Sequence, residues 1–407
     1  MRIFFICQRV PYPPDRGDKI TTFNEIRHLS KKHEVHVFCL ADGKQDLANM
    51  AKLQDYAKSV TAVPVTAFGG KLRALLAIFL GGPLSVAAFN KRKLHDAIKR
   101  RFAETKPDAM IVYSCNVAQY AAHFADVPRI MQFADLDSLK WGQYAERSGV
   151  ILRAIYRLEQ RRLLAYERNI AHTFAHSLVC TEVEELDFKR LIPGPPVTLV
   201  ANGVDLEYFH PSGTAKRPAS MVFTGVMDYL PNVDAVEWFC REIFPLVQRD
   251  IPDASFVICG SRPSPAVTRL AQIPGVTVTG RVPDTRPHMD SAQVFVAPLR
   301  MARGIQNKVL EALAMGLPCV ATTAAWRGTV IPLGEGIVAT DGPQAFARKV
   351  IELLCDHSHR EQMASKARHS AEKYYTWDAQ MQCLDQVFEA VTKPCGKLPN
   401  GQPPVST

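Results

Sequence analysis

The sequence predicts an α/β fold with two doubly wound domains, and three observations support this prediction. Short apolar runs alternate with longer amphipathic stretches along the whole chain. The apolar runs are nearly continuous, which is typical of parallel strands that helices cover on both faces. The chain has 407 residues, and this length favours two domains because one domain usually has roughly 100 to 200 residues.

The first domain is predicted to span residues 1–205. Its strands are expected at residues 2–7, 34–40, 59–65, 109–114, 129–134, 176–180 and 197–201. The segments between these runs have mostly helical periodicity. The N-terminal run of MRIFFICQRV is too short for the apolar part of a signal peptide, so it is expected to be the first strand.

The alternation stops at NGVDLEYFHPSGTAKRPAS, which is rich in Gly, Pro and Ser, and residues 206–220 are assigned as a linker. The second domain is predicted at 221–376. Its strands are expected at residues 221–225, 255–260, 276–280, 293–298 and 318–322. GEGIVA at 334–339 fits a GxGxxA pattern but enters a further strand instead of opening a helix, so no dinucleotide site is expected there.

A final helix is predicted at 377–392, and residues 393–407 have the composition of a loose tail. Two doubly wound domains leave a cleft between the carboxyl ends of their strands, and open α/β sheets bind their ligands there. The chemistry of this protein is therefore expected at that cleft.

The composition excludes a disordered or fibrous protein, because 47% of the residues are hydrophobic and 22% are charged. Residues 1–200 carry 29 basic and 20 acidic side chains, whereas residues 201–407 carry 20 of each. The basic first half indicates an anionic partner such as a membrane surface, a nucleic acid or a phosphorylated substrate. Aromatic residues do not interleave regularly with the basic ones, so no nucleic-acid partner is expected.

The ten cysteines form no CxxC motif and no close pairs, and several lie inside apolar runs. This usage predicts buried reduced thiols and a cytoplasmic location.

The segment LRALLAIFLGGPLSVAAF, residues 72–89, is strongly apolar but is broken by Gly81-Gly82-Pro83. Neither half can span a bilayer core of about 30 Å. Basic residues flank the segment and recur in the helix expected near residues 151–171: Lys71, Arg73, Lys91, Arg92, Lys93, Arg153, Arg157, Arg161, Arg162 and Arg168. The pattern suits a peripheral, interfacial segment on anionic lipid at the inner face of the membrane. A buried core segment with solvated basic flanks is the alternative.

The segment QVFVAPLRMARGIQNKVLEALAMGLPCVAT is the most informative for chemistry. A strand ends at Pro298, and a loop with Gly304 leads into a helix expected at 305–315. The helix N-terminus faces the cleft and makes an anion site, to which Arg303 and Lys308 add positive charge. A diphosphate fits there, and Glu311, one turn into the helix, can accept hydrogen bonds from a ribose diol. The alternatives are a solvated Lys308–Glu311 ion pair and a plain surface role for Arg303.

Several segments resemble retaining glycosyltransferases with the GT-B fold, in the large family numbered four. NGVD at 202–205 with Phe209 and Pro211 is similar to that family's interdomain segment, and GLPCVAT is similar to its GxPVVAT. More narrowly, FTGVMDYLPNVDAVEWF, TGRVPDTRP, ARGIQNKVLEALAMG, PYPPDRGDKI, DLDSLKWGQYA and the region around YERNIA resemble the sugar transferases of bacterial exosortase and PEP-CTERM systems. The resemblance extends over roughly residues 1–390.

The resemblance implies two Rossmann-like domains, a final helix that returns to the first domain, and a nucleotide-sugar site. It assigns donor binding to Gly17, Lys19, Gly225, Arg281, Gly304, Ile305, Gln306, Asn307, Lys308 and Glu311. Each of these roles has an alternative. Gly225 could be a simple turn glycine, and Gly17 and Lys19 could belong to an ordinary surface loop. Arg281 could form a surface ion pair.

The sequence departs from the broader family at two points. That family carries Glu-x7-Glu, but the position eight residues before Glu311 holds Arg303. It also usually has an Arg and a Lys in the loop that here runs from Gly225 to Asn232, where neither occurs. We read the two losses together: Arg303 supplies positive charge that the loop lacks, which makes it a candidate catalytic residue.

Asp135 and Asp137 follow a predicted buried strand, where the broader family often has His-Asp. Carboxylates there can bind hydroxyls or accept a proton, so both are candidate catalytic residues. A helix N-cap by Asp137 or Ser138 is the competing explanation.

Together these features predict a glycosyltransferase that moves a sugar from a nucleotide-diphosphate donor to a hydroxyl of a lipid-linked saccharide in exopolysaccharide biosynthesis. Retention of configuration is implied by the resemblance only. No metal or other cofactor is expected, because the helix N-terminus, Arg303 and Lys308 can stabilise the leaving diphosphate. The alternatives are a nucleotide-sugar epimerase or phosphorylase on the same fold and a non-enzymatic basic protein that binds membranes or nucleic acid.

Overall fold

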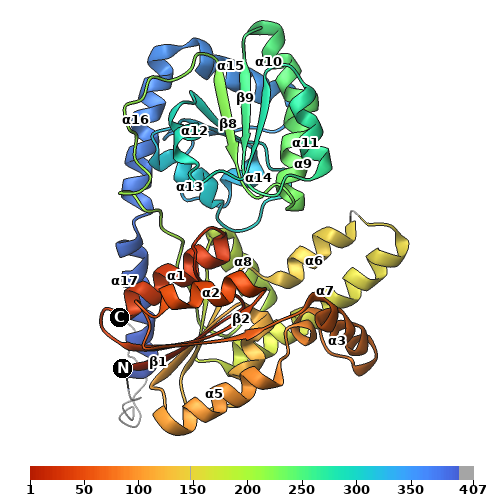
Figure 1. The fold of residues 1–407 in the computed structure, drawn as a ribbon, viewed down its shortest axis with the longest axis vertical. Helices are drawn as coiled ribbons and strands as arrows, with labels where there is room; N and C mark the ends of the chain where they lie inside the picture. The colour runs from red at the N-terminus through yellow and green to blue at the C-terminus, as the bar shows by residue number, and fades with distance from the viewer. Residues whose placement is uncertain (147, 394–407) are drawn as a thin grey trace, which may run out of the picture.

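The computed structural model describes residues 1–146 and 148–393, which form two α/β halves, one above the other in Figure 1. The predicted tail lies outside the described residues except for Lys393. Each half contains one parallel sheet with helices on both faces, so the predicted fold class is confirmed.

The first sheet has seven strands in the order β3-β2-β1-β4-β5-β6-β7. They are β1 (Arg2–Cys7), β2 (Glu34–Ala41), β3 (Ser59–Pro64), β4 (Ala109–Tyr113), β5 (Arg129–Ala134), β6 (His176–Val179) and β7 (Val197–Leu199). The helices of this half are α1 (Gly17–Leu29), α2 (Lys44–Leu53), α3 (Ala67–Leu80), α4 (Leu84–Ala88), α5 (Arg92–Thr105), the 3-10 helix η1 (Cys115–Tyr120), α6 (Asp137–Glu146), α7 (Val150–Thr173) and α8 (Glu182–Leu191). All neighbouring strands are parallel.

The second sheet has six parallel strands in the order β10-β9-β8-β11-β12-β13. They are β8 (Ser220–Thr224), β9 (Ser255–Cys259), β10 (Val276–Gly280), β11 (Val294–Ala297), β12 (Cys319–Ala321) and β13 (Ile337–Ala339). The helices are α9 (Leu230–Trp238), the π-helix η2 (Phe239–Ile243), α10 (Phe244–Asp250), α11 (Pro265–Arg269), the 3-10 helix η3 (Leu270–Gln272), α12 (Arg286–Asp290), α13 (Asn307–Ala314), α14 (Thr323–Trp326), α15 (Pro343–Cys355), α16 (His357–Tyr374) and α17 (Trp377–Thr392). Every predicted strand is present, with ends that differ by at most two residues.

Alternate residues of the strands are buried on opposite faces of the first sheet. Phe4 and Ile6 of β1 lie in one hydrophobic cluster, whereas Ile3 and Phe5 lie in the other. Successive side chains of a strand point to opposite faces. A strand covered on both faces therefore has a continuous apolar sequence, which is why these runs predicted the strands well.

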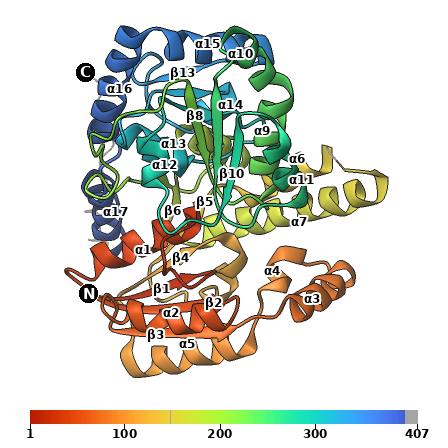
Figure 2. The same ribbon diagram turned by 45° about the horizontal axis from the view of Figure 1, so that its top comes forward.

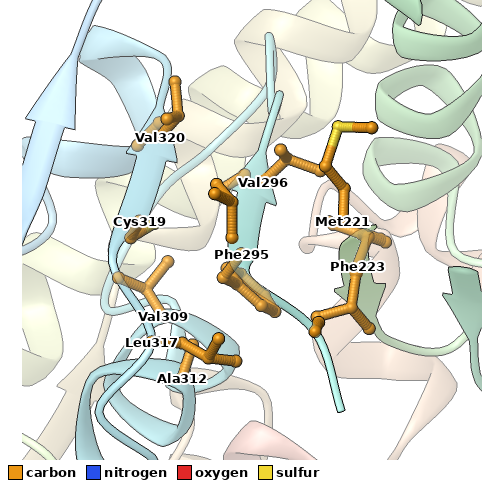
Figure 3. Close-up of a cluster of buried hydrophobic side chains, with 14 of the residues drawn as sticks. Met221, Phe223, Phe295, Val296, Val309, Ala312, Leu317, Cys319 and Val320 are labelled. Atoms are coloured by element: carbon orange, nitrogen blue, oxygen red, sulfur yellow. The ribbon is translucent and has the colours of Figure 1, made fainter. Parts of the chain in front are cut away.

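The helix α13 packs into the core of the second half. Figure 3 shows Val309 and Ala312 of α13 packed near Phe295 of β11 and Cys319 of β12. Val309, Ala312, Phe295 and Cys319 are all fully buried. This packing fixes the position of α13, so its first turn is held at the carboxyl edge of the sheet.

The last helix, α17, lies beside α1 and β1 of the first half, away from the second half that precedes it in sequence (Figure 1). Leu384 and Phe388 belong to the same cluster as Ile3 and Phe5. The His28 ring also contacts the Asp385 carboxylate at 2.9 Å. The chain thus crosses between the halves twice, and the two crossings meet where the Val204 amide donates to the Tyr375 carbonyl.

The apolar segment 72–89 forms the end of α3 and all of α4, separated at Gly81, which has a φ of 81°. Among the described residues, no helix has the length and apolar character needed to cross a membrane. The nine cysteines of the described chain are free thiols, and seven of them are buried; Cys395 lies outside the described residues.

Candidate active site

The carboxyl edges of the two sheets face each other. A Cβ built on Gly304, in the loop after β11, would lie 3.7 Å from the Cys180 sulfur, which follows β6 of the first sheet. A small cavity lies between the halves, lined by Cys180 and Ala201 on one side and by Ile305 and Gly328 on the other. Figure 2 shows α13 and α12 above the first sheet in the same region.

The loop before α13 is tightly folded. Gly304 has a φ of 63°, and a Cβ on Gly328 would lie only 2.3 Å from the Gly304 carbonyl oxygen. The Gln306 side-chain amide donates to the carbonyl of Arg303 at 3.0 Å, so it shapes the loop. The helix begins at Asn307, two residues later than predicted, and Ile305 and Gln306 are loop residues.

Lys308 is enclosed by the loop that follows β8. Its ammonium donates to Asn232 Oδ1 and lies 4.6 Å from the centre of the Phe223 ring. Burial lowers the pKa of Lys308 to about 7. A Cβ on Gly225 would lie 3.2 Å from the Lys308 nitrogen and 2.7 Å from the Asn232 amide. Gly225 is thus more than a turn glycine, because a side chain there would displace the lysine.

Glu311 lies one turn further along α13. Burial raises the pKa of Glu311 to about 7, against the opposing effect of the nearby Lys308 charge. Among the ion pairs of the described chain, none joins Glu311 to Lys308, whose ammonium instead binds Asn232. The alternative of a solvated Lys308–Glu311 ion pair is therefore wrong.

Arg303 contacts the first domain. Its guanidinium lies 3.6 Å from the Asp187 carboxylate on α8, and its side chain is 22% exposed. The Arg303 Nε atom is buried and has no hydrogen-bond partner among the described residues. The neighbouring Glu184 is 2% exposed, one of its oxygens has no partner, and burial raises its pKa well above the usual value. The alternative of a solvated surface arginine is therefore wrong.

The two predicted aspartates follow β5 at the edge of the first sheet. The preceding residue, Ala134, has a φ of 61°, a conformation that non-glycine residues rarely adopt. Asp137 accepts a hydrogen bond from the Asn116 amide at 3.1 Å. Burial and then the Asp135 charge raise the pKa of Asp137 to about 6, whereas Lys140 acts in the opposite direction.

The N-cap explanation for Asp137 and Ser138 is wrong. The Glu167 carboxylate of α7 accepts from the Ser138 backbone amide at 3.2 Å, so a side chain distant in sequence satisfies the start of α6. The Ser138 hydroxyl is buried without a hydrogen-bond partner. Burial raises the pKa of Glu167 to about 8.

Sequence reasoning missed the residues that surround these aspartates: Cys115, Asn116, Lys140, Glu167 and Glu184. The aspartates raise the pKa of Lys140, and the Tyr229 and Tyr144 hydroxyls also act on it. Tyr229 belongs to the second domain, so α6 meets the loop after β8 here. Of these five residues, only Lys140 could have been predicted from the sequence, because it lies one helical turn after Asp137 in the same segment.

Gly17 and Lys19 have different surroundings. A Cβ on Gly17 would lie 3.5 Å from the Asn307 amide, so this glycine adjoins the start of α13. Asn307 in turn accepts from Asn202, which accepts from Thr21. The Lys19 ammonium pairs with Asp46 at 3.3 Å, and its side chain is 10% exposed. The prediction that Lys19 reaches a phosphate is corrected, because a carboxylate of its own domain holds the ammonium.

Arg281 is exposed after β10. No ion pair involving it is present in the described chain, so the surface ion-pair alternative is wrong. Within residues 1–146 and 148–393, no group of three His, Cys, Asp or Glu side chains is arranged to hold a metal ion.

Comparisons with known proteins agree with this architecture. Residues 218–356 match the family model described as glycosyl transferases group 1. A sucrose-phosphate synthase from Thermosynechococcus elongatus has a TM-score of 0.70 and 15% identity, covering 96% of this chain and 99% of that one. No curated protein sequence matches the chain.

Two further similar structures are complexes with ligands. Anabaena HepE in complex with UDP has a TM-score of 0.67 and 14% identity, covering 96% of this chain and 100% of that one. A mutant of S. aureus TarM in complex with fondaparinux, alpha-GlcNAc-glycerol and UDP has a TM-score of 0.64 and 10% identity, covering 95% and 99%. Residues 218–356 are therefore similar to the glycosyl transferases group 1 family, and the whole chain has the two-domain fold of these solved glycosyltransferase structures.

Proposed function

We propose that this protein transfers a sugar from a nucleotide-diphosphate sugar to a hydroxyl group of a saccharide. The observation that carries the proposal is the Lys308 ammonium, held against Asn232 and beside Gly225 at the start of α13. Free amide groups at a helix N-terminus and a desolvated cation favour a diphosphate. The UDP complex of the structurally similar HepE supports a nucleotide donor.

The donor residues have distinct roles in this proposal. Lys308 and Arg303 stabilise the negative charge that develops on the diphosphate when the bond to the sugar breaks. Glu311 accepts hydrogen bonds from the ribose hydroxyls, and Gly225 lets the backbone approach the phosphates. Arg281, exposed after β10, contacts the base or a phosphate. The nucleoside diphosphate leaves with the bonding electrons.

The acceptor hydroxyl is assigned to the edge of the first sheet at Asp135 and Asp137. With a pKa of about 6, Asp137 is mostly ionised at neutral pH. It can then accept the proton that the acceptor hydroxyl loses as its oxygen bonds to the sugar carbon. Asn116 and Lys140 orient this carboxylate and keep it charged.

The finer parts of the proposal rest on resemblance and charge. We infer a lipid-linked saccharide as acceptor, in the exopolysaccharide biosynthesis associated with exosortase and PEP-CTERM systems. We also infer retention of the anomeric configuration, no metal requirement and a cytoplasmic enzyme that associates with an anionic membrane surface. The excess of basic residues in the first half supports the last point.

A panel of nucleotide sugars tests the reaction class. Thermal shift with UDP, GDP and ADP and their sugars identifies the base, since a ligand at 100 times its Kd stabilises the fold by about 2.7 kcal/mol. Products are then analysed with and without a saccharide acceptor. Transfer that requires the acceptor supports the proposal, whereas an isomerised nucleotide sugar without acceptor indicates an epimerase and overturns it.

A further inference from the structure

Two segments of the first domain expose large apolar side chains. Phe79 and Leu80, at the end of α3, are 84% and 83% exposed, and Val150 and Ile151, at the start of α7, are 82% and 79% exposed. The residues of this group, which we call the α3–α7 apolar surface, are Leu75, Leu76, Phe79, Leu80, Val150, Ile151 and Leu152. The alternative of a buried core segment is wrong for the end of α3. Both figures show α3 and the α6–α7 hairpin projecting from the same side of the first domain (Figures 1 and 2).

Hydrogen bonds join the end of α3 and the start of α4 to the middle of α7, 8 to 12 residues beyond Val150 and Ile151. The Arg162 guanidinium of α7 donates to the Ala77 and Ile78 carbonyls at the end of α3, at 3.0 Å each. The Glu159 carboxylate, which is buried, accepts from the backbone amides of Leu84 and Ser85 at the start of α4. These hydrogen bonds satisfy the backbone carbonyls at the end of α3 and the backbone amides at the start of α4. A loosely packed segment would not be held in this way, so the neighbouring apolar side chains belong to an ordered surface that is exposed to solvent.

The surroundings of the surface are basic. Residues 56–95 contain six Lys or Arg and no Asp or Glu, and residues 148–158 contain two Arg and no acid. On α7, Arg153, Arg157 and Arg161 are exposed at four-residue intervals, and none of them has an ion pair within the described chain. Residues four apart share one face of a helix, so α7 carries a stripe of free positive charge.

We propose that the α3–α7 apolar surface docks the protein onto a bilayer that contains anionic lipids. The apolar side chains enter the boundary between headgroups and acyl chains, and the arginines bind the anionic headgroups. The 14 residues of α3 measure about 21 Å at 1.5 Å per residue, too short to span the bilayer core, so the helix lies in the interface. A second copy of the chain is disfavoured as the occupant, since a symmetric pair would bring the same positive stripe together.

The role of membrane docking in catalysis rests on the proposed function, in which the acceptor is a saccharide attached to a lipid. The helix α6 begins at Asp137, in the candidate acceptor site, and runs to the α6–α7 turn beside Val150. Its ten residues measure about 15 Å at 1.5 Å per residue. Gly142 lets α6 approach α7 closely, because a Cβ there would lie 2.7 Å from the Gln160 amide. A saccharide attached to a lipid in the docked bilayer is therefore delivered to the site.

Vesicle co-sedimentation tests the proposal with the full chain. Phosphatidylcholine vesicles are compared with and without 30% phosphatidylglycerol, at low and high salt. We expect binding to the anionic vesicles only, weakened by salt. Phe79→Ser/Leu80→Ser and Val150→Ser/Ile151→Ser should each weaken binding about tenfold or more. Arg153→Gln/Arg157→Gln should weaken it about 25-fold, since each basic residue contributes about a factor of five.

The control variant Leu47→Ser/Leu333→Ser removes two exposed leucines elsewhere and should bind vesicles like the wild type. UDP titration of every variant reports the nucleotide site separately, so loss of UDP binding counts against the proposed function and leaves the docking result intact. Equal binding to neutral vesicles, no binding at all, or variants that bind normally would overturn the docking proposal. A dimeric wild type that the serine variants make monomeric would also overturn it, by assigning the surface to a second copy.

Discussion

Arg303 of the second domain pairs with Asp187 of the first, with 3.6 Å between Nη2 and Oδ2. The two residues are 116 positions apart in the sequence and come from loop and helix elements at the facing edges of the two sheets. Asp187 also binds Arg190 of its own helix, at 2.6 Å. The ion pair therefore positions the Arg303 guanidinium, the cation that the proposed function places at the donor diphosphate, from across the domain interface.

Replacing Arg303 should slow the chemical step. Arg303→Ala is expected to lower the single-turnover rate at saturating donor by about 10²- to 10³-fold, the scale seen when one preorganised stabiliser is removed. Arg303→Glu should abolish activity, because a carboxylate would then face the phosphates with Lys308 as the remaining cation. Asp187→Asn is the matched control: it removes the ion pair but keeps the arginine, so its loss should be smaller. A wild-type-like rate in Arg303→Glu would end the hypothesis.

Nucleotide binding should take up a proton through Lys308. With a pKa of about 7, the free enzyme carries a mostly neutral Lys308 at pH 8, and a bound diphosphate favours the charged form. Titration calorimetry at pH 8 in buffers of different ionisation enthalpy should show uptake approaching one proton per UDP. Lys308→Arg should remove this uptake, because arginine is already charged. Equal uptake in the variant would assign the proton to another group.

Glu311→Gln should weaken nucleotide binding by about 1 to 3 kcal/mol, the range for hydrogen bonds to a charged group. The loss should disappear when the ligand is the 2′,3′-dideoxy nucleoside diphosphate, since the hydroxyls that Glu311 would accept from are then absent. Titration calorimetry of the wild type and of Glu311→Gln with each of the two ligands gives the four binding free energies of a thermodynamic cycle. An equal loss with the dideoxy ligand would remove Glu311 from the ribose site.

The transfer rate should rise with pH as Asp137 ionises, around pH 6. Because the Lys140 charge lowers the pKa of Asp137, Lys140→Met should move this limb of the profile to higher pH. Asp135→Asn should move it to lower pH, because the Asp135 charge raises that pKa. The pH profile of the transfer rate is measured for each variant. If Lys140 and Asp135 had purely structural roles, the variants would show lower rates, but the rise of the rate near pH 6 would not shift.

Glu25 should make the fold less stable as the pH rises. It is fully buried on α1, both carboxylate oxygens lack a hydrogen-bond partner in the part of the chain that the structure describes, and burial raises its pKa from 4.5 to about 8. The folded state thus keeps a proton that the unfolded chain loses above pH 4.5, so stability falls from there to about pH 8. Glu25→Gln should match the wild type near pH 4.5 and exceed it by on the order of 2 to 4 kcal/mol at pH 8. Urea unfolding at both pH values measures the difference, and a constant offset would contradict this account.

The strands and the helix α13 were predictable because their signals are local. The apolar runs of β1 and β4 reflect burial on both faces. The loop with Gly304 and the helix from Asn307 follow from a strand, a glycine and a short amphipathic segment in sequence. The strand entered by GEGIVA was also indicated by its local pattern and is present as β13.

The surroundings of the site were not predictable. Glu167 satisfies the start of α6 from 29 residues away, and Asn232 binds Lys308 across 76 residues. Lys19 has the right charge and lies near Gly17, yet Asp46 holds its ammonium. The sequence does not state which of several carboxylates a lysine meets, because that depends on how separate helices pack.

The sequence by itself thus determined the two parallel sheets, the helix α13 after the Gly304 loop and the basic first half, since periodicity, turn residues and charge are properties of short segments. Only the tertiary structure decided that Arg303 meets Asp187, that Phe79 and Val150 are exposed, and that Glu311 and Lys308 do not pair. These features depend on distances between residues far apart in the chain, and such distances are fixed when the elements pack against each other.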